Sequence, residues 1–268
     1  MKLKTAIAIM AAGALAPAAS LWAQGPAPLH ERTAQTDLPL ESARASMHLQ
    51  HLFLSIAVQP EMKRIEGTAF YRVIPRADLA EFQFDLDPRY TVSRVEIDDV
   101  ALSPADWNNP DGLLTVALPQ PVAVGEPVMV LIDYAGVPNE AANPPWGGGF
   151  VWSETEAGQP WIATAVQGEG CDLIWPCIDH SSHRIDTLDM MVTVPDGLIV
   201  AGNGRQIGTS DNGDGTTTFR WQARDPSNYG ITLQIAPYEV ARHDYESVFG
   251  NTCPLVFWHL PNHAEGAN

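Results

Sequence analysis

The chain of 268 residues is long enough to fold as one large domain or two small ones. It contains 32 acidic residues against 15 lysines and arginines, which gives a formal net charge of −17 at pH 7. A surface with this excess of carboxylates repels the phosphates of nucleic acid and of anionic lipid. The composition therefore excludes nucleic acid as a partner and is typical of a soluble protein that could attract cationic groups such as free amino termini.

The first 23 residues have the pattern of a secretory signal peptide. Two lysines precede an apolar, alanine-rich run, and the small residue Ala23 offers a cleavage site. An uncleaved membrane anchor is the alternative, but the apolar run is short and is interrupted by Gly13 and Pro17. We therefore expect an exported protein, periplasmic or extracellular, without membrane contact once residues 1–23 are removed.

Most of the remaining sequence has the pattern of short β-strands. Residues 24–46 are rich in proline, alanine and charge and lack apolar periodicity, so we expect a flexible leader there. From residue 47 to 261, apolar and polar side chains alternate in short runs such as HLFLSIAVQP. Proline, glycine and aspartate separate these runs, and GTSDNGDGTTTFRWQA contains the Asn-Gly and Asp-Gly pairs of a tight hairpin. The pattern predicts an all-β domain with a sandwich-like architecture.

One short segment, QGEGCDLIWPCIDHSSH, holds two cysteines and two histidines: Cys171, Cys177, His180 and His183. Thiolates and imidazoles are the ligands that zinc prefers. Closed zinc sites, however, usually space paired ligands about two to four residues apart, whereas these cysteines are six apart with apolar residues between them. A disulfide and a pair of buried free thiols are the alternatives. The odd total of three cysteines allows at most one disulfide and leaves one thiol over.

Other signatures of catalysis or metal binding are absent from the sequence. It contains no Gly-x-Ser-x-Gly element, no glycine-rich phosphate loop and no pair of Cys-x-x-Cys motifs. His259 and His263 have the spacing of a zinc protease, but Leu260 stands where that motif needs glutamate, and Pro261 disfavours the required helix. The run that begins at Asp211 lacks the spacing of a calcium loop. We therefore predict no catalytic residue and no metal ligand in this chain.

The segment IATAVQGEGCDLIWPCID resembles a known family of peptidases. Residues 164–167 read TAVQ and residues 176–179 read PCID. This order and spacing resemble the threonine-glutamine-x-acid-or-glutamine strand and the later proline-cysteine-x-aspartate step of the aminopeptidase N type of zinc metallopeptidases, which includes the leukotriene hydrolase and aminopeptidase B branch. Segments such as GTAFYRV, VTVPDGLIVAGNG and PSNYGITLQIAPYEV extend the resemblance over about residues 48–262. Ala165 departs from the family pattern, which usually has glutamine there.

The resemblance implies the amino-terminal domain of that family, a large, saddle-shaped β-sandwich-like domain of mostly antiparallel strands. The resemblance implies contact with the substrate for Gln167 alone, because this residue occupies the position of the glutamate or glutamine that contacts the free α-amine of the substrate. A side-chain oxygen can accept a hydrogen bond from an ammonium group. The alternative is a strand glutamine that is satisfied by neighbouring backbone. Cys177 and Asp179 would be packing residues near the interface with the catalytic domain, and His180 and His183 would be loop residues.

The zinc site of the family belongs to the domain that follows the matched region. Neither its His-Glu-x-x-His helix nor its Gly-x-Met-Glu-Asn strand occurs before Asn268. The resemblance therefore implies peptide as the substrate and zinc as the cofactor of the parent enzyme, with no cofactor in this chain. Residues 262–268 would be a stub of the catalytic domain.

Two hypotheses of function follow. In the first, the chain is the amino-terminal part of an exported zinc metalloaminopeptidase; it supplies a cleft wall and Gln167 and is inactive without the zinc domain. In the second, it is a stand-alone, non-catalytic exported β-domain that binds a peptide or protein partner. The second hypothesis predicts an exposed apolar patch where a catalytic domain would otherwise dock. The resemblance favours the first.

Overall fold

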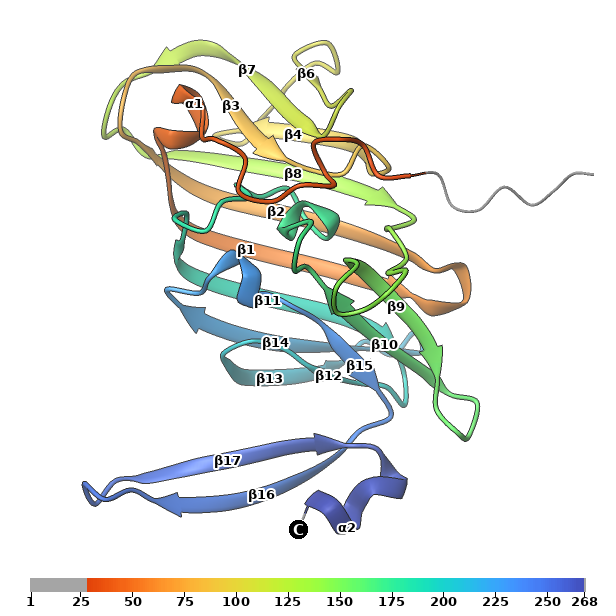
Figure 1. Ribbon diagram of the computed structural model, residues 1–268. Helices are drawn as coiled ribbons and strands as arrows, with labels where there is room; N and C mark the ends of the chain where they lie inside the picture. Colours follow the sequence, from red (N-terminus) through yellow and green to blue (C-terminus); the bar gives the residue numbers. More distant parts are fainter. Residues whose placement is uncertain (1–27, 268) are drawn as a thin grey trace, which may run out of the picture.

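The computed structural model describes residues 28–267, which form several β-sheets (Figure 1). The predicted signal peptide, residues 1–23, lies outside the described residues. The largest sheet has eight strands in the order β13-β14-β11-β1-β2-β8-β4-β5. Its strands, in chain order, are β1 (Met47–Gln59), β2 (Arg64–Pro75), β4 (Thr91–Ile97), β5 (Val100–Ala101), β8 (Val128–Gly136), β11 (Ile185–Pro195), β13 (Arg205–Asp211) and β14 (Thr216–Arg224).

Three smaller sheets complete the described strands. They are a four-stranded sheet in the order β12 (Ile199–Ala201), β15 (Gln234–Ala236), β10 (Pro160–Ala165) and β9 (Gly149–Glu154), a three-stranded sheet in the order β3 (Leu79–Asp85), β7 (Leu113–Val122) and β6 (Trp107–Asn108), and a hairpin of β16 (Glu239–Glu246) and β17 (Thr252–His259). The helical elements are single turns: α1 (Ser42–Ala45), α2 (Ala264–Ala267), and the 3₁₀ turns η1 (Pro60–Met62), η2 (Cys171–Leu173), η3 (Asn228–Gly230) and η4 (Pro261–His263). The prediction of an all-β domain is confirmed.

The strands pair mostly antiparallel, as expected. The exception among the named strands of the described chain is β1, which pairs in parallel with β11 and antiparallel with β2. This parallel pair joins the strands of the first half of the chain to those of the second half within one sheet. The predicted hairpin at residues 208–223 is confirmed as β13 and β14, and Asp211 Oδ1 accepts a hydrogen bond from Gly213 N in its turn (2.8 Å).

Strand alternation explains which residues form the core. In β1, Leu52, Leu54 and Ile56 are buried while the residues between them are only half-buried, because successive side chains of a strand point to opposite faces of the sheet. The buried side chains of the large and small sheets form one continuous cluster. This core fixes the loops that lie between the sheets.

Residues 28–46, for which the sequence predicts a flexible leader, lie against the domain. Figure 1 shows this segment, coloured red to orange, ending in α1, which lies beside β3. Arg44 is 1% exposed, and its Nη1 lies 3.0 Å from Asp85 Oδ2, while Arg32 Nη2 lies 2.9 Å from Asp85 Oδ1. The charged residues that led us to expect a solvated segment therefore form ion pairs that hold this segment to β3.

The hairpin of β16 and β17 lies apart from the other sheets (Figure 1). One contact with the core is the ring pair of Trp258 and Trp221, whose centroids are 5.7 Å apart. Many apolar side chains of the hairpin are exposed: Val240, Tyr245, Val248, Phe249, Leu255 and Phe257. Among the described residues, no helix has the length and apolar character needed to cross a membrane.

Candidate functional site

Gln167 lies in a turn directly after β10, at an exposed position. The sequence leaves open a strand glutamine satisfied by neighbouring backbone. In the structure, residue 167 is outside the strand, and its side chain makes no hydrogen bond to another described residue. The carboxamide is therefore free to bind an external donor or acceptor, and contact with a substrate α-amine stays a prediction.

Three hydrogen bonds hold this turn, two between backbone groups and one to a side chain. Gly170 N donates to Val166 O (2.8 Å), which closes the turn itself. Thr36 N, from the amino-terminal segment, donates to Gly168 O (3.1 Å). Glu169 Oε2 accepts from Gly148 N (2.8 Å), which ties the turn to the loop before β9. The position of Gln167 is therefore set by groups from distant parts of the chain.

Gly170 occupies a conformation that only glycine adopts readily. Its φ is +116° and its ψ is −176°, a region that is closed to residues with a side chain. A Cβ at this position would also lie 2.2 Å from Asp179 Oδ2. The absence of a side chain at Gly170 lets the Asp179 carboxyl group pack under the turn that carries Gln167.

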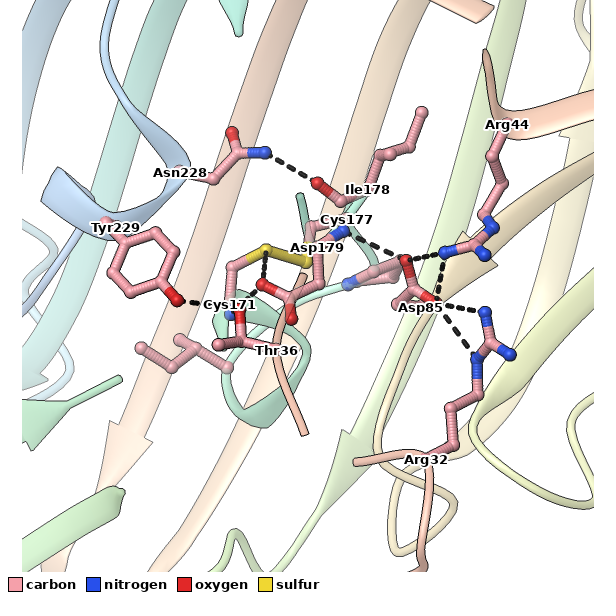
Figure 2. The surroundings of a disulfide bond; sticks show 12 residues. Arg32, Thr36, Arg44, Asp85, Cys171, Cys177, Ile178, Asp179, Asn228 and Tyr229 are labelled. Carbon is pink, nitrogen blue, oxygen red and sulfur yellow. Dashed lines mark hydrogen bonds and ion pairs between the residues drawn. A yellow bond between two sulfur atoms is a disulfide. The ribbon is translucent and has the colours of Figure 1, made fainter. Parts of the chain in front are cut away.

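Cys171 and Cys177 form a disulfide (Figure 2). Of the alternatives that the sequence leaves open, the structure therefore contains the disulfide, and Cys253 is a free, exposed cysteine. The histidines of the same segment have other partners: His183 Nε2 lies 2.8 Å from Met47 O, and His180 Nδ1 lies 2.7 Å from Ser182 Oγ.

The residues of this segment do not fit zinc. Within the described part of the chain, the group of potential metal ligands that lie close together is Cys171, Cys177 and Asp179. The two sulfur atoms are bonded to each other, so neither is a thiolate that could bind a metal ion.

The loop closed by the disulfide lies on the inner face of the large sheet. Three buried tyrosines, Tyr90, Tyr134 and Tyr71, donate their hydroxyl groups to it. The acceptors, in the same order, are the carbonyl oxygens of Leu173 (2.6 Å), Ile174 (2.9 Å) and Pro176. Burial raises the pKa of all three tyrosines, so they stay protonated and remain donors. Three residues of the loop are therefore held by tyrosine side chains.

Buried carboxyl groups surround the disulfide (Figure 2). Asp85 accepts from both arginines of the amino-terminal segment and also from Asp179 N (2.9 Å). Asp179 Oδ1 accepts from Cys171 N (3.2 Å). Burial raises the pKa of Asp179 to about 7, with further increases from the charges of Asp85 and Asp37, against hydrogen bonds from Thr36 and Cys171 that lower it. Burial likewise raises the pKa of Asp172.

Sequence reasoning proposed Gln167 but missed the residues that hold its turn. Glu169 is the clearest case, because its carboxylate bridges two segments that are 21 residues apart. The flanking glycines, Gly168 and Gly170, were an available signal of a tight turn with restricted backbone conformation. No pattern in the local sequence indicated that Arg32 and Arg44 bind Asp85.

Comparisons with known proteins support the fold. No family model and no curated protein matches the sequence. Among solved structures, an M1 zinc metallopeptidase from Deinococcus radiodurans matches with a TM-score of 0.69 and 22% identity. A mutant of an M1 zinc metallopeptidase from the same organism, bound to a Tyr-Ser-Ala substrate, matches with a TM-score of 0.68 and 24% identity. A two-domain M1 zinc metallopeptidase mutant bound to L-arginine gives 0.68 and 23%.

Each match covers 84% of this chain and 50% of the metallopeptidase. The chain has the fold of about half of an M1 zinc metallopeptidase. It spans about half the length of these M1 enzymes, and at 22–24% identity the likeness establishes the fold alone. The resemblance drawn from the sequence is thus confirmed at the level of the M1 fold.

Proposed function

We propose that the chain is the amino-terminal β-domain of an exported zinc-dependent metalloaminopeptidase, which removes amino-terminal residues from peptides. The observation that carries the proposal is the likeness to M1 enzymes. The matches cover 84% of this chain but only half of each matching enzyme. In this proposal the chain supplies one wall of the substrate cleft. The zinc ligands come from another part of the enzyme.

Gln167 is the residue of this chain that we propose to contact the substrate. Its Oε1 accepts a hydrogen bond from the protonated α-amine and so selects peptides with a free amino terminus. The turn around Gln167 is held by Glu169, Gly170 and Thr36, and a turn held in this way supports a residue that positions the substrate. The net negative charge of the chain favours the approach of a cationic amine.

The first experiment compares two products. One is the chain from residue 24 to 268, and the other is the full product of the reading frame that contains it. Bound zinc is measured by elemental analysis, and release of an aminoacyl arylamide is measured in the same samples. We expect zinc and turnover in the longer product and neither in the shorter one. Chelator-sensitive turnover by residues 24–268, or a reading frame that encodes no zinc domain, contradicts the proposal.

The second experiment tests the amine contact in the active enzyme. Removing a hydrogen bond to a charged group costs about 1.5–3 kcal/mol, so Gln167→Ala should lower kcat/KM for free-amine substrates by about 10- to 100-fold. Gln167→Glu should retain activity because a carboxylate also accepts from an ammonium. Gln159→Ala, at an exposed turn at the other end of β10, is the matched control and should leave kcat/KM unchanged.

A second candidate function is a non-catalytic exported β-domain that binds a separate peptide or protein. The exposed apolar side chains of the hairpin favour it, with Phe249 87% exposed and Phe257 47% exposed. Hydrogen exchange separates the two candidates. If the chain belongs to a peptidase, β16 and β17 should be protected in the full product without any added partner; if it is a separate module, they should exchange freely until a partner binds.

A further inference from the structure

We propose that Trp146 determines specificity by contacting the side chain of the substrate's first residue, so that peptides with an aromatic amino-terminal residue are preferred. This inference rests on the proposed function, because it takes the α-amine bound at Gln167 as its reference point. Trp146 lies in the loop between β8 and β9, next to the turn that carries Gln167.

The indole of Trp146 is 68% exposed, although its backbone is well ordered by hydrogen bonds. Trp146 N and Gly147 N both donate to Asn143 O at 2.9 Å. Asn139 Nδ2 donates to Gly148 O at 2.7 Å, two residues after the tryptophan. A large apolar ring held on a fixed backbone loses little conformational entropy when a ligand covers it, which is why tryptophan is favoured at binding sites.

The loop of Trp146 and the turn of Gln167 are in direct contact. Gly148 N donates to Glu169 Oε2 (2.8 Å), and a Cβ built on Gly168 would lie 3.8 Å from Trp146 O. The residues at this junction are Gly147, Gly148 and Gly168, which have no side chains, so the backbones of the two segments can approach closely. The two proposed contact groups therefore belong to one small region of the surface.

The covalent geometry of an amino acid requires that the groups that bind its amine and its side chain lie close together. The α-amine and the side chain of the first residue are both attached to one Cα, and the next Cα is only about 3.8 Å away. Groups that bind the amine and the first side chain must therefore be close neighbours. Trp146 meets this condition, whereas the other exposed aromatic residues of the described chain lie in the hairpin of β16 and β17: Tyr245, Phe249 and Phe257.

The chemistry of the loop favours an aromatic side chain over a cationic one. Residues 141–153 contain no acidic or basic residue. The nearest acid before this segment, Glu140, forms an ion pair with Lys63 (2.9 Å). The exposed indole of this segment offers stacking, and stacked aromatic pairs gain affinity beyond their buried area. The carboxylate nearest to it, that of Glu169 in the neighbouring turn, already accepts a hydrogen bond from Gly148 N (2.8 Å).

The test uses nuclear magnetic resonance on residues 24–268 with three probes: Phe-Ala-amide, Ala-Ala-amide and N-acetyl-Phe-Ala-amide. The indole signal of Trp146 is assigned with Trp146→Phe, and the carboxamide signal of Gln167 with Gln167→Glu. We expect both free-amine dipeptides to shift the Gln167 signal. Phe-Ala-amide alone should shift the Trp146 signal and should bind about three- to tenfold more tightly than Ala-Ala-amide.

Variants complete the test. Trp146→Ala should remove the preference for Phe-Ala-amide, Trp146→Phe should keep most of it, and Phe249→Ala should change nothing. If the Gln167 signal responds but Phe-Ala-amide has no advantage, or Arg-Ala-amide binds more tightly, the role of Trp146 is wrong and the proposed function stands. If the acetylated probe binds as well as the free amine, or the Gln167 signal does not respond, the amine contact itself is wrong.

Discussion

Asp179 is a buried carboxyl group between a glycine and a disulfide. It is 5% exposed, and the space that it fills exists because Gly170 has no Cβ. Burial raises its pKa to about 7, which is far above the value of about 3.9 expected in an unfolded chain. The folded protein therefore holds a proton there that the unfolded chain releases.

This proton makes stability depend on pH. As the pH rises from about 4 to about 7, the unfolded chain releases the proton first, so the free energy of unfolding falls across this window. Above pH 7, the free energy of unfolding is lower by on the order of 4 kcal/mol, because each pKa unit corresponds to about 1.4 kcal/mol. Asp179→Asn keeps the shape of the side chain but removes its ionisation. The free energy of unfolding of this variant, relative to that of the unmodified protein, should therefore increase as the pH rises. Denaturant unfolding at pH 4, 6 and 8 measures the difference.

The control is Asp99→Asn, which changes an exposed carboxylate beside β4. Its free energy of unfolding should follow that of the unmodified protein at all three pH values. Parallel pH profiles for Asp179→Asn and the unmodified protein would show that Asp179 is ionised in the folded state at pH 4 and above.

At the scale of elements, the segment before β1 is held to β3 by charge pairs. Asp85, at the end of β3, is buried and accepts from Arg32 and Arg44, and α1 packs beside this strand. Arg44 is almost fully buried, and Asp85 balances its charge there. The segment and the strand therefore form one structural unit.

Arg44→Ala should destabilise the protein by about 3 kcal/mol, because it leaves a buried carboxylate with one cation in place of two. Arg64→Ala removes an exposed arginine whose Nε lies 3.6 Å from Glu66 Oε1 and should cost less than about 1 kcal/mol. Denaturant unfolding compares the two variants. Equal costs would mean that the segment of residues 28–46 contributes little to stability.

The strands could be predicted from the sequence because their periodicity is local. The runs that contain Leu52 and Leu54 show which face is buried without reference to any other segment. The packing of residues 28–46 could not be predicted, because it depends on Asp85, which lies 41 residues beyond Arg44. The same holds for Glu169 and Trp146, whose neighbours are brought together only by the pairing of β9 with β10. Gln167 was identified through the family pattern, and its place in a turn after the strand came from the structure.

At the scale of the whole molecule, negative charge is far in excess, with 32 acidic residues against 15 lysines and arginines. Like charges on a compact surface repel one another, and salt screens this repulsion. At pH 7.5, raising the sodium chloride concentration from 20 to 300 mM should therefore raise Tm, by about 2–4 °C for each kcal/mol gained. Near pH 4.6, the isoelectric point, the same salt should have almost no effect. A Tm that falls with salt at pH 7.5 would mean that attractive ion pairs outweigh the repulsion.

The parallel pairing of β1 with β11 determines when the large sheet can be completed. During synthesis, β1 meets β2 after a short turn, but its other edge has no partner until residues 185–195 exist. More than a hundred residues must be made in the meantime, and closing so long a loop is slow compared with forming a hairpin. A central strand with an open edge can pair with other chains. The nascent protein is therefore most exposed to aggregation in the interval between its second strand and its eleventh.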